Sequence, residues 1–210
     1  MKTSIQPKIY QLKVTLKHSK PPIWRRVLVS SNMPLSDIHT VLQIVMGWNN
    51  EHLHHFMVEI DKKRTFYGPT SEDDAMGFGL SEEKDERTVK ISQILKKVKD
   101  SIIYEYDFGD SWVHVIELES ILPYDETVEL PRCVTGKRAC PPEDCGGVSN
   151  YSYLLEAFTD PSHPEHQEVT EHINGLYGSV FKPEVFDADK VNRHFTKLKE
   201  FIKKHSKIDV

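Results

Sequence analysis

The sequence lacks several features that would assign it to a familiar class. No apolar run approaches the roughly 20 residues needed to cross a bilayer, and the first ten residues lack the apolar core of a secretory signal. There are only three cysteines, whereas a secreted disulfide framework normally uses more of them, in pairs. A formal net charge of −5 argues against a protein that coats nucleic acid with its whole surface. These absences predict a cytoplasmic protein without a membrane partner.

The composition that is present suits a folded domain. Hydrophobic residues make up 38% of the chain and charged residues 28%, which supports a buried core. A length of 210 residues is somewhat above the usual size of one domain and short for two. We therefore expect one domain over residues 1–210, with a sheet-rich part (1–122), a loop rich in proline, glycine and cysteine (123–147) and a helical part (148–210).

The first sixty residues show the clearest periodicity. Alternation in Ile9 to Leu16 and in Ile23 to Val29 predicts two strands of a hairpin. Helical spacing from Leu35 to Met46 predicts a helix, and His52 to Ile60 resembles a third strand. This order predicts an α+β fold with a β-grasp-like antiparallel or mixed sheet and one packed helix, followed by a C-terminal helical part.

The rest of the chain adds further elements. Residues Ser71 to Glu86 hold seven acidic side chains and one lysine, which is typical of a solvated loop. We expect a short helix over Ile91 to Val98 and two strands, Ile102 to Phe108 and Trp112 to Glu119. Later helices are expected near Tyr151, Pro164 and Val191.

Five short strings stand out, because none of them is common and all of them occur in one chain. Two dipeptides, Asp160-Pro161 and Asn192-Arg193, fit the same pattern later in the chain. The strings are Pro22 to Arg26 (PIWRR), Met46 to Trp48 (MGW), His52 to His54 (HLH), Tyr104 to Trp112 (YEYDFGDSW) and Cys140 to Gly147 (CPPEDCGG).

In this order and spacing the sequence resembles the plasmid pRiA-type ORF-three-like family over nearly the whole chain. The resemblance implies an α+β domain from bacteria or archaea, often encoded on plasmids or near transposable elements, with no settled biochemical activity. The chain departs from the family pattern in two places. The acidic stretch Ser71 to Glu86 looks like an insertion, and Val148-Ser149-Asn150 stands where relatives tend to have another glycine.

Some members of that family carry a resolvase label, which the residues here do not support. Serine recombinases need a catalytic serine amid several arginines, and tyrosine recombinases need an Arg-His-Arg set. Here the arginines are scattered and no helix-turn-helix string is evident. Asp107-Phe108-Gly109 matches a kinase tripeptide, but the glycine-rich loop and the H-R-D string of kinases are missing. We expect neither a recombinase nor a kinase.

The three cysteines are the first candidate metal ligands. Cys133, Cys140 and Cys145 lie in one loop, and zinc favours thiolate and imidazole ligands, so zinc is the cofactor to consider. The usual C-x-x-C pair is absent, and the alternative is that the thiols only fill space. A catalytic Cys145 would need a neighbouring base, which the adjacent sequence does not supply. The fourth ligand is expected to be His114, with His52, His54 and Asp144 as alternatives.

The histidines and acids near the strands form a second candidate. In an extended chain His52 and His54 share one face, so they can bind a metal or form an ordinary polar surface. Asp107 and Asp110 flank a glycine, which is typical of a turn capped by aspartate. Two aspartates near a histidine can also hold a divalent ion for phosphodiester hydrolysis.

Trp24, Arg25 and Arg26 are candidates for binding a protein or nucleic-acid partner. Alternation places Trp24 and Arg26 on one face of a strand and Arg25 on the other. A tryptophan beside an arginine can stack on bases and bind phosphate. The alternatives are a cation–π pair, or a buried arginine that binds Asp107 or Asp110.

The last helix offers a basic surface. Residues Lys190 to Lys207 include seven basic side chains and one acid, a local net charge of +6. Such a surface, with Lys197, Lys203 and Lys204, can attract phosphate backbones, although the solvated side of any amphipathic helix looks similar.

Two functions from different classes fit these residues. The first is an intracellular binding module without catalytic activity, with a protein or nucleic-acid partner and an accessory role in plasmid or transposable-element biology. The second is a metal-dependent hydrolase, which requires the cysteine, histidine and aspartate side chains to converge in one cleft. The residues favour the binding module.

Overall fold

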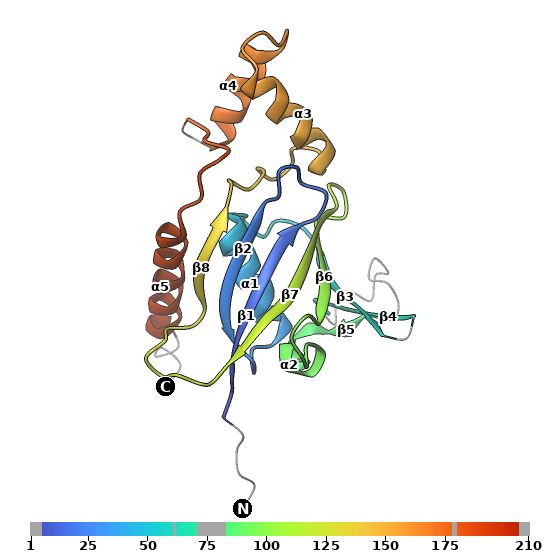
Figure 1. The fold of residues 1–210 in the computed structure, drawn as a ribbon, viewed down its shortest axis with the longest axis vertical. Helices are drawn as coiled ribbons and strands as arrows, with labels where there is room; N and C mark the ends of the chain where they lie inside the picture. The colour runs from blue at the N-terminus through green and yellow to red at the C-terminus, as the bar shows by residue number, and fades with distance from the viewer. Residues whose placement is uncertain (1–5, 61, 71–82, 178–179, 206–210) are drawn as a thin grey trace, which may run out of the picture.

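The computed structural model describes residues 6–60, 62–70, 83–177 and 180–205. Eight strands form one sheet in the order β5-β4-β3-β6-β7-β1-β2-β8, and among them β4 and β5 are the parallel pair. The strands are β1 (Ile9–Leu16), β2 (Trp24–Ser30), β3 (His54–Ile60), β4 (Lys63–Gly68), β5 (Lys84–Asp85), β6 (Ser101–Tyr106), β7 (Trp112–Leu122) and β8 (Arg132–Lys137) (Figure 1).

The helices surround this sheet unevenly. One helix lies behind the middle of the sheet, another runs beside β8, and a helical hairpin extends beyond one end (Figure 1). Within the described ranges, no helix is both long enough and apolar enough to cross a membrane. The helix behind the sheet is α1 (Leu35–Met46), and the helix beside β8 is α5 (Ala188–His205). The hairpin consists of α3 (Gly147–Thr159) and α4 (His166–Tyr177). The structure also contains a short helix, α2 (Ile91–Ile94), and a 3-10 turn, η2 (Glu86–Thr88).

The alternating pattern of β1 separates the two faces of the sheet. Leu12 and Val14 are fully buried and belong to one core cluster with the buried side chains of α1. We call the face of the sheet that α1 covers the covered face (Figure 1). Gln11 and Lys13 point to the opposite, open face and are only half-buried. Burial of the apolar side chains of the sheet against α1 supplies the main driving force for this packing, because it removes apolar area from water.

The α+β class is confirmed, whereas the β-grasp-like arrangement is not. β1 and β2 form the expected hairpin, and α1 occupies the expected residues. β3, however, does not return beside that hairpin, because β6 and β7 lie between β3 and β1. The sheet is thus wider and differently ordered than the first sixty residues indicate.

Several element boundaries also differ from the expectations. The part predicted as an irregular loop contains β8, which pairs with β2. The predicted helix over Ile91 to Val98 ends at Ile94, and the third strand begins at His54 rather than His52. Of the acidic stretch, residues 71–82 lie outside the described residues, while its last residues contribute β5 and the start of η2.

Candidate functional site

Three connecting segments meet at one end of the sheet, which we call the loop end. They are the α1–β3 loop (residues 47–53), the β6–β7 turn (107–111) and the β8–α3 loop (138–146). The indole nitrogen of Trp48 donates a hydrogen bond to the Pro141 carbonyl at 3.0 Å, which joins the first segment to the third. The strings MGW, HLH, YEYDFGDSW and CPPEDCGG therefore converge, although they are far apart in the chain.

The two glycines before α3 permit the closest of these approaches. Gly146 and Gly147 have φ of 83° and 73°, a region that residues with a Cβ rarely adopt. A Cβ on Gly147 would lie 2.5 Å from the carbonyl oxygen of Asp110. The amide of Gly146 donates a hydrogen bond to the Asp110 carboxylate at 2.9 Å. Only glycine lets the β8–α3 loop lie directly on the β6–β7 turn.

His52, Asp107 and Asp144 come together at this junction, one from each segment. The Nε2 atom of His52 lies 3.2 Å from Oδ1 of Asp144 and 3.8 Å from Oδ2 of Asp107. Donor atoms about 3.4 Å apart are what metal–ligand bonds of about 2.0–2.2 Å produce around a tetrahedral ion. The three side chains can therefore hold one cation between them, and we call them the His/Asp cluster.

The cluster has donor atoms that lack other partners. His52 Nε2 is inaccessible to solvent and forms no hydrogen bond, despite the two nearby carboxylates. Asp107 accepts hydrogen bonds from the amides of Gly109 and Asp110 at Oδ1, which leaves Oδ2 directed at the cluster. Asp144 is exposed over 67% of its side chain. One side of the cluster is thus held by the protein and the other faces solvent.

A second layer of hydrogen bonds positions the cluster. The hydroxyl of Tyr106 accepts hydrogen bonds from the amides of Glu51 and His52 and donates one to Glu143 at 2.5 Å. Glu143 also accepts a hydrogen bond from the Asn49 amide at 2.8 Å. Tyr106 and Glu143 therefore tie the backbone that carries His52 to the loop that carries Asp144. Such outer contacts orient metal ligands in proteins.

The predicted zinc ligands lie elsewhere. Cys133, Cys140 and Cys145 are free, buried thiols, and His114 is fully buried in the core. Across the part of the chain that the structure describes, His52, Asp107 and Asp144 are the one group of three potential ligands whose donor atoms lie within 4.8 Å of each other. The structure therefore does not gather three thiols, or two thiols and His114, around one point.

Burial also disfavours the thiols as nucleophiles. It raises the pKa of Cys133 to about 11 and that of Cys145 to about 12, and it raises the pKa of Cys140 further. A thiolate is the form that attacks carbon, and the raised pKa disfavours that form. The structure thus agrees with the alternative in which the cysteines fill space.

His54 belongs to a buried network rather than to the His/Asp cluster. Because β3 begins at His54, His52 lies in the loop and the two rings do not share a strand face. His54 contacts Glu86 at 3.0 Å, and its ring stacks on His39 at 3.5 Å between centroids. The ring nitrogens of His39 form hydrogen bonds with Tyr104 Oη and Asn50 Oδ1. His39 and Glu86 were not among the predicted site residues, because their partners lie in distant segments.

Arg25 has a structural role. It is 1% exposed, and its guanidinium donates hydrogen bonds to the carbonyl oxygens of Val45, Trp24 and Lys137. The same group lies 3.9 Å from the centre of the Phe186 ring. Arg25 is therefore buried, as one of the alternatives had it, but these carbonyls hold it in place of Asp107 or Asp110. Arg25 is therefore not accessible to a partner.

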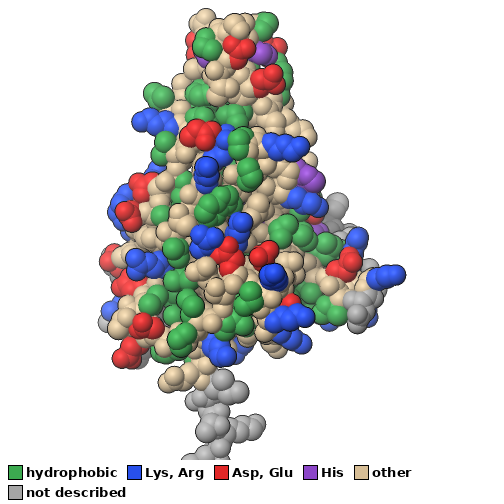
Figure 2. Space-filling model, in the orientation of Figure 1, with side chains coloured by type: hydrophobic (Ala, Val, Ile, Leu, Met, Phe, Trp, Pro, Cys, Tyr) green, Lys and Arg blue, Asp and Glu red, His purple; other side chains and the backbone are tan. Residues whose placement is uncertain are grey.

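Trp24 and Arg26 remain on the open face, as their alternation predicts. Arg26 is paired with Glu119 at 2.5 and 2.8 Å and lies 5.2 Å above the Trp24 ring. This is the cation–π arrangement considered as the alternative to partner binding. Figure 2 shows blue, red and green side chains interspersed over this face, without a large region of one charge.

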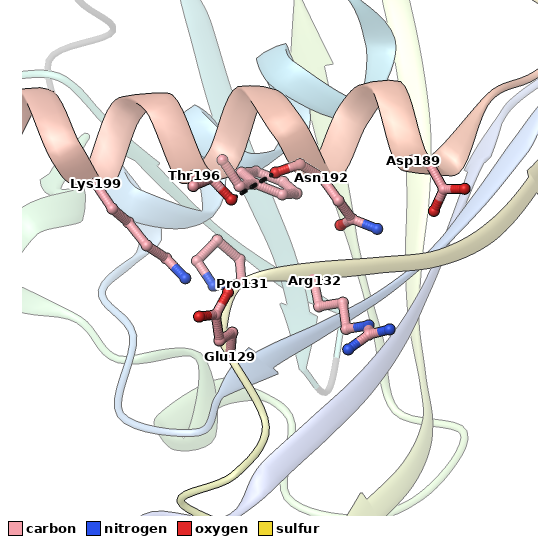
Figure 3. Close-up of a pocket in the computed structure, with 8 residues that line it drawn as sticks. Glu129, Pro131, Arg132, Asp189, Asn192, Thr196 and Lys199 are labelled. Carbon is pink, nitrogen blue, oxygen red and sulfur yellow. Dashed lines mark hydrogen bonds between the residues drawn. The ribbon is translucent and has the colours of Figure 1, made fainter.

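The C-terminal helix packs by its apolar side and exposes its basic side. Val191 and Phe195 are buried, while Lys197 and Lys203 are exposed. The side chain of Lys204 lies outside the described residues. A cleft between α5 and the chain that leads into β8 carries side chains of both signs, so no single ligand charge is favoured (Figure 3). Among its lining residues are Glu129, Arg132, Asp189, Asn192 and Lys199.

These observations define first a class: an α+β protein with one wide sheet and a group of potential metal ligands at its loop end. A sequence model of the plasmid pRiA4b ORF-3-like protein family matches residues 8–190, and the chain belongs to that family. The resemblance inferred from the five strings is thereby confirmed.

Two relatives extend this assignment. The uncharacterized protein y4hQ of Sinorhizobium fredii is 38% identical over 173 residues, which are 78% of this chain and 79% of that protein. The crystal structure of MM3350, a protein of unknown function from Methanosarcina mazei Go1, has a TM-score of 0.75 and 35% sequence identity. The similarity covers 88% of this chain and 98% of that chain, so the two proteins share the fold.

Proposed function

We propose that the protein is a binding module that holds one divalent metal ion between His52, Asp107 and Asp144. The observation that carries the proposal is the buried Nε2 atom of His52, which has no hydrogen bond and lies 3.2 and 3.8 Å from two carboxylate oxygens. An imidazole nitrogen left in this position is satisfied by a cation that both carboxylates also bind.

The donor set suggests the kind of ion. The imidazole suits zinc and other late transition metals, whereas the two carboxylates also suit magnesium and manganese. The affinity of such a site rises along the series from Mn²⁺ to Cu²⁺, with Zn²⁺ above Mn²⁺. Zn²⁺ is therefore the expected tight ligand and Mg²⁺ a weak one.

The test measures the binding of Zn²⁺, Mn²⁺ and Mg²⁺ to the purified protein by calorimetry, with elemental analysis of the metal carried through purification. We expect one Zn²⁺ per chain, and a loss of affinity of at least about tenfold in His52→Asn and in Asp107→Asn, because each removes a direct ligand. Cys145→Ser is the matched control and should bind as the wild type does. Zinc that is lost only in Cys145→Ser would assign the metal to the thiols instead.

A metal-dependent hydrolase is the second candidate, favoured by the exposed side of the His/Asp cluster. Three protein ligands leave a fourth position for water, as catalytic zinc sites do, and Asp144 borders solvent. Hydrolysis of bis(p-nitrophenyl) phosphate and of p-nitrophenyl acetate, with and without Zn²⁺ or Mn²⁺, tests this role. Turnover that needs the ion and disappears in Asp107→Asn would support it, and no turnover with a fully loaded site would leave the binding module.

The partner of the module is a separate part of the proposal. Arg25 is buried and Arg26 is paired with Glu119, so the exposed basic side of α5 is the remaining candidate surface for nucleic acid. A salt-sensitive gel shift that is lost in a Lys197→Glu, Lys203→Glu variant would support nucleic acid, and its absence in the wild type would favour a protein partner. An accessory role in plasmid biology is supported by the family's description.

A further inference from the structure

Four polar residues from α1, β6 and the α1–β3 loop form a closed ring of hydrogen bonds, which we call the His39 ring. The backbone amide of Asn50 donates to Oε1 of Gln43 at 3.1 Å, and Nε2 of Gln43 donates to the hydroxyl oxygen of Tyr104 at 3.0 Å. His39 closes the ring, because Nδ1 lies 2.8 Å from that hydroxyl and Nε2 lies 2.7 Å from Oδ1 of Asn50. The ring thereby joins α1 and β6 to the loop that carries His52.

The direction of every hydrogen bond in the ring follows from one fixed donor. A backbone amide can only donate, so Gln43 accepts at Oε1 and donates with its amino group to Tyr104. The Tyr104 hydroxyl is then free to donate to Nδ1 of His39, and the protonated Nε2 of His39 donates to Oδ1 of Asn50. Only a neutral His39 with its proton on Nε2 completes the ring, because a proton on Nδ1 would leave the Tyr104 hydroxyl hydrogen without an acceptor.

The surroundings of the ring keep His39 in this neutral form. His39, Gln43 and Tyr104 are 6%, 4% and 0% exposed. Burial and the neighbouring His54, whose ring stacks on His39 at 3.5 Å between centroids, lower the pKa of His39 to about 4. The imidazole is therefore neutral at pH 7, and the ring supplies the hydrogen bonds that its buried nitrogens need.

The ring fixes the backbone two residues before the first potential metal ligand. Asn50 has φ of 62°, a left-handed conformation that asparagine adopts more readily than most residues. Its amide and its side chain both belong to the ring, while the amides of Glu51 and His52 donate to the hydroxyl of Tyr106. Tyr104 and Tyr106 lie on the same face of β6. Two tyrosines of one strand thus hold three consecutive residues of the loop.

We propose that the His39 ring sets the affinity of the His/Asp cluster for its metal ion, with His39, Gln43 and Tyr104 as positioning residues. This role requires the metal site proposed above. A ligand that becomes ordered only when the ion binds costs conformational entropy, whereas His52 on a loop held by the ring is ordered beforehand. The ring acts on His52 through Asn50 and the backbone, and its three positioning side chains are not ligands themselves.

Calorimetric titration with Zn²⁺ compares the full-length wild type with two variants that open the ring. Tyr104→Phe removes the shared hydroxyl, and Asn50→Gly removes the acceptor of His39 but keeps the backbone amide and tolerates the positive φ. Each should raise the Kd for Zn²⁺ about tenfold, the lower end of the range for outer contacts of metal ligands. Asn50→Asp keeps the acceptor and should bind Zn²⁺ at least as tightly as the wild type.

Three controls separate the ring from general damage to the protein. Asn49→Gly adds a flexible residue to the same loop without removing an atom of the ring, and keeps the amide that bonds to Glu143. Tyr153→Phe removes an exposed hydroxyl of α3. Both should bind Zn²⁺ as the wild type does. NMR of the imidazole nitrogens should show His39 protonated only at Nε2 in the wild type, and a mixture of tautomers in Tyr104→Phe.

The outcomes distinguish this role from the metal site itself. Binding that is about tenfold weaker in Tyr104→Phe and Asn50→Gly, but not in the controls, supports the role of the ring. An unchanged Kd in both variants, even with lower stability in urea, would show that the ring only stabilises the fold and would overturn this role alone. No Zn²⁺ bound by the wild type would overturn the metal site, and the role of the ring with it.

Discussion

Polar side chains and potential metal ligands occur both on the covered face of the sheet and at its loop end, but their surroundings differ. On the covered face, Arg25, His114 and Cys133 are almost completely buried and pack within the core. At the loop end, His52 and Asp144 are partly exposed, and with Asp107 they come from three separate segments. The comparison teaches that convergence separates the two groups: in the described part of the chain the donor atoms of His52, Asp107 and Asp144 lie within 4.8 Å of one another, whereas His114 and Cys133 belong to no such group.

The largest expected effect concerns the arginine of the covered face. Arg25→Ala should lower the free energy of unfolding by about 3–5 kcal/mol, because the buried Val45 carbonyl and the partly buried carbonyls of Trp24 and Lys137 lose their donor, and each such loss costs about 1–3 kcal/mol. Arg26→Ala is the matched control on the open face and should cost about 1 kcal/mol or less. Urea denaturation of both variants measures the difference. Equal losses would contradict the contrast between the two faces.

The buried histidines should make stability depend on pH. Burial lowers the pKa of His39 and of His114 to about 4, below the ordinary value of 6.5. Because the unfolded chain binds more protons between these values, the stabilisation is fully present above pH 6.5 and is lost as the pH falls toward 4. Each histidine accounts for roughly 3 kcal/mol over that range.

Urea denaturation between pH 7.5 and 4 measures this loss, and His39→Gln should make the curve less steep. A wild-type stability that stays constant down to pH 4.5 would show that His39 and His114 are not buried as neutral rings.

A smaller effect is expected from the second layer of the loop end. Tyr106→Phe removes the hydroxyl that holds the amides of Glu51 and His52 and bonds to Glu143, so His52 loses its fixed position. The Kd for Zn²⁺ should rise about 10–100-fold, the range typical of outer-layer contacts of metal ligands. Tyr153→Phe serves as the exposed control. An unchanged Kd in Tyr106→Phe would mean that the ligands hold their geometry without this contact.

The last prediction concerns the reactivity of the thiols rather than stability or metal binding. At pH 7.5 the buried cysteines should react with iodoacetamide far more slowly than cysteines of the urea-unfolded chain, because burial raises the pKa of Cys133 to about 11 and that of Cys145 to about 12. Mass spectrometry of the alkylated protein gives the rate for each site. Rapid alkylation of folded protein at Cys145 would place that thiol with the accessible groups of the loop end.

The parts of the fold that follow local patterns were predicted from the sequence. The alternation in β1 and β2 and the helical spacing in α1 and α5 set which side of each element is apolar. β8 was missed because Pro131 and Gly136 are typical of a loop, and an edge strand of six residues has little room to show alternation. The strand order was also missed, since pairing between distant strands leaves no local signal.

The residues of the candidate site were likewise predicted only in part from the sequence. The sequence named His52, Asp107 and Asp144 only as alternatives in separate candidate sets, whereas alternation was enough to place Trp24 and Arg26 on one strand face. Only the tertiary structure decided that these three ligands meet while Cys133, Cys140, Cys145 and His114 do not. The physical reason is that a ligand set is defined by distances between side chains from separate segments. Those distances depend on how the α1–β3 loop, the β6–β7 turn and the β8–α3 loop pack together at the end of the sheet.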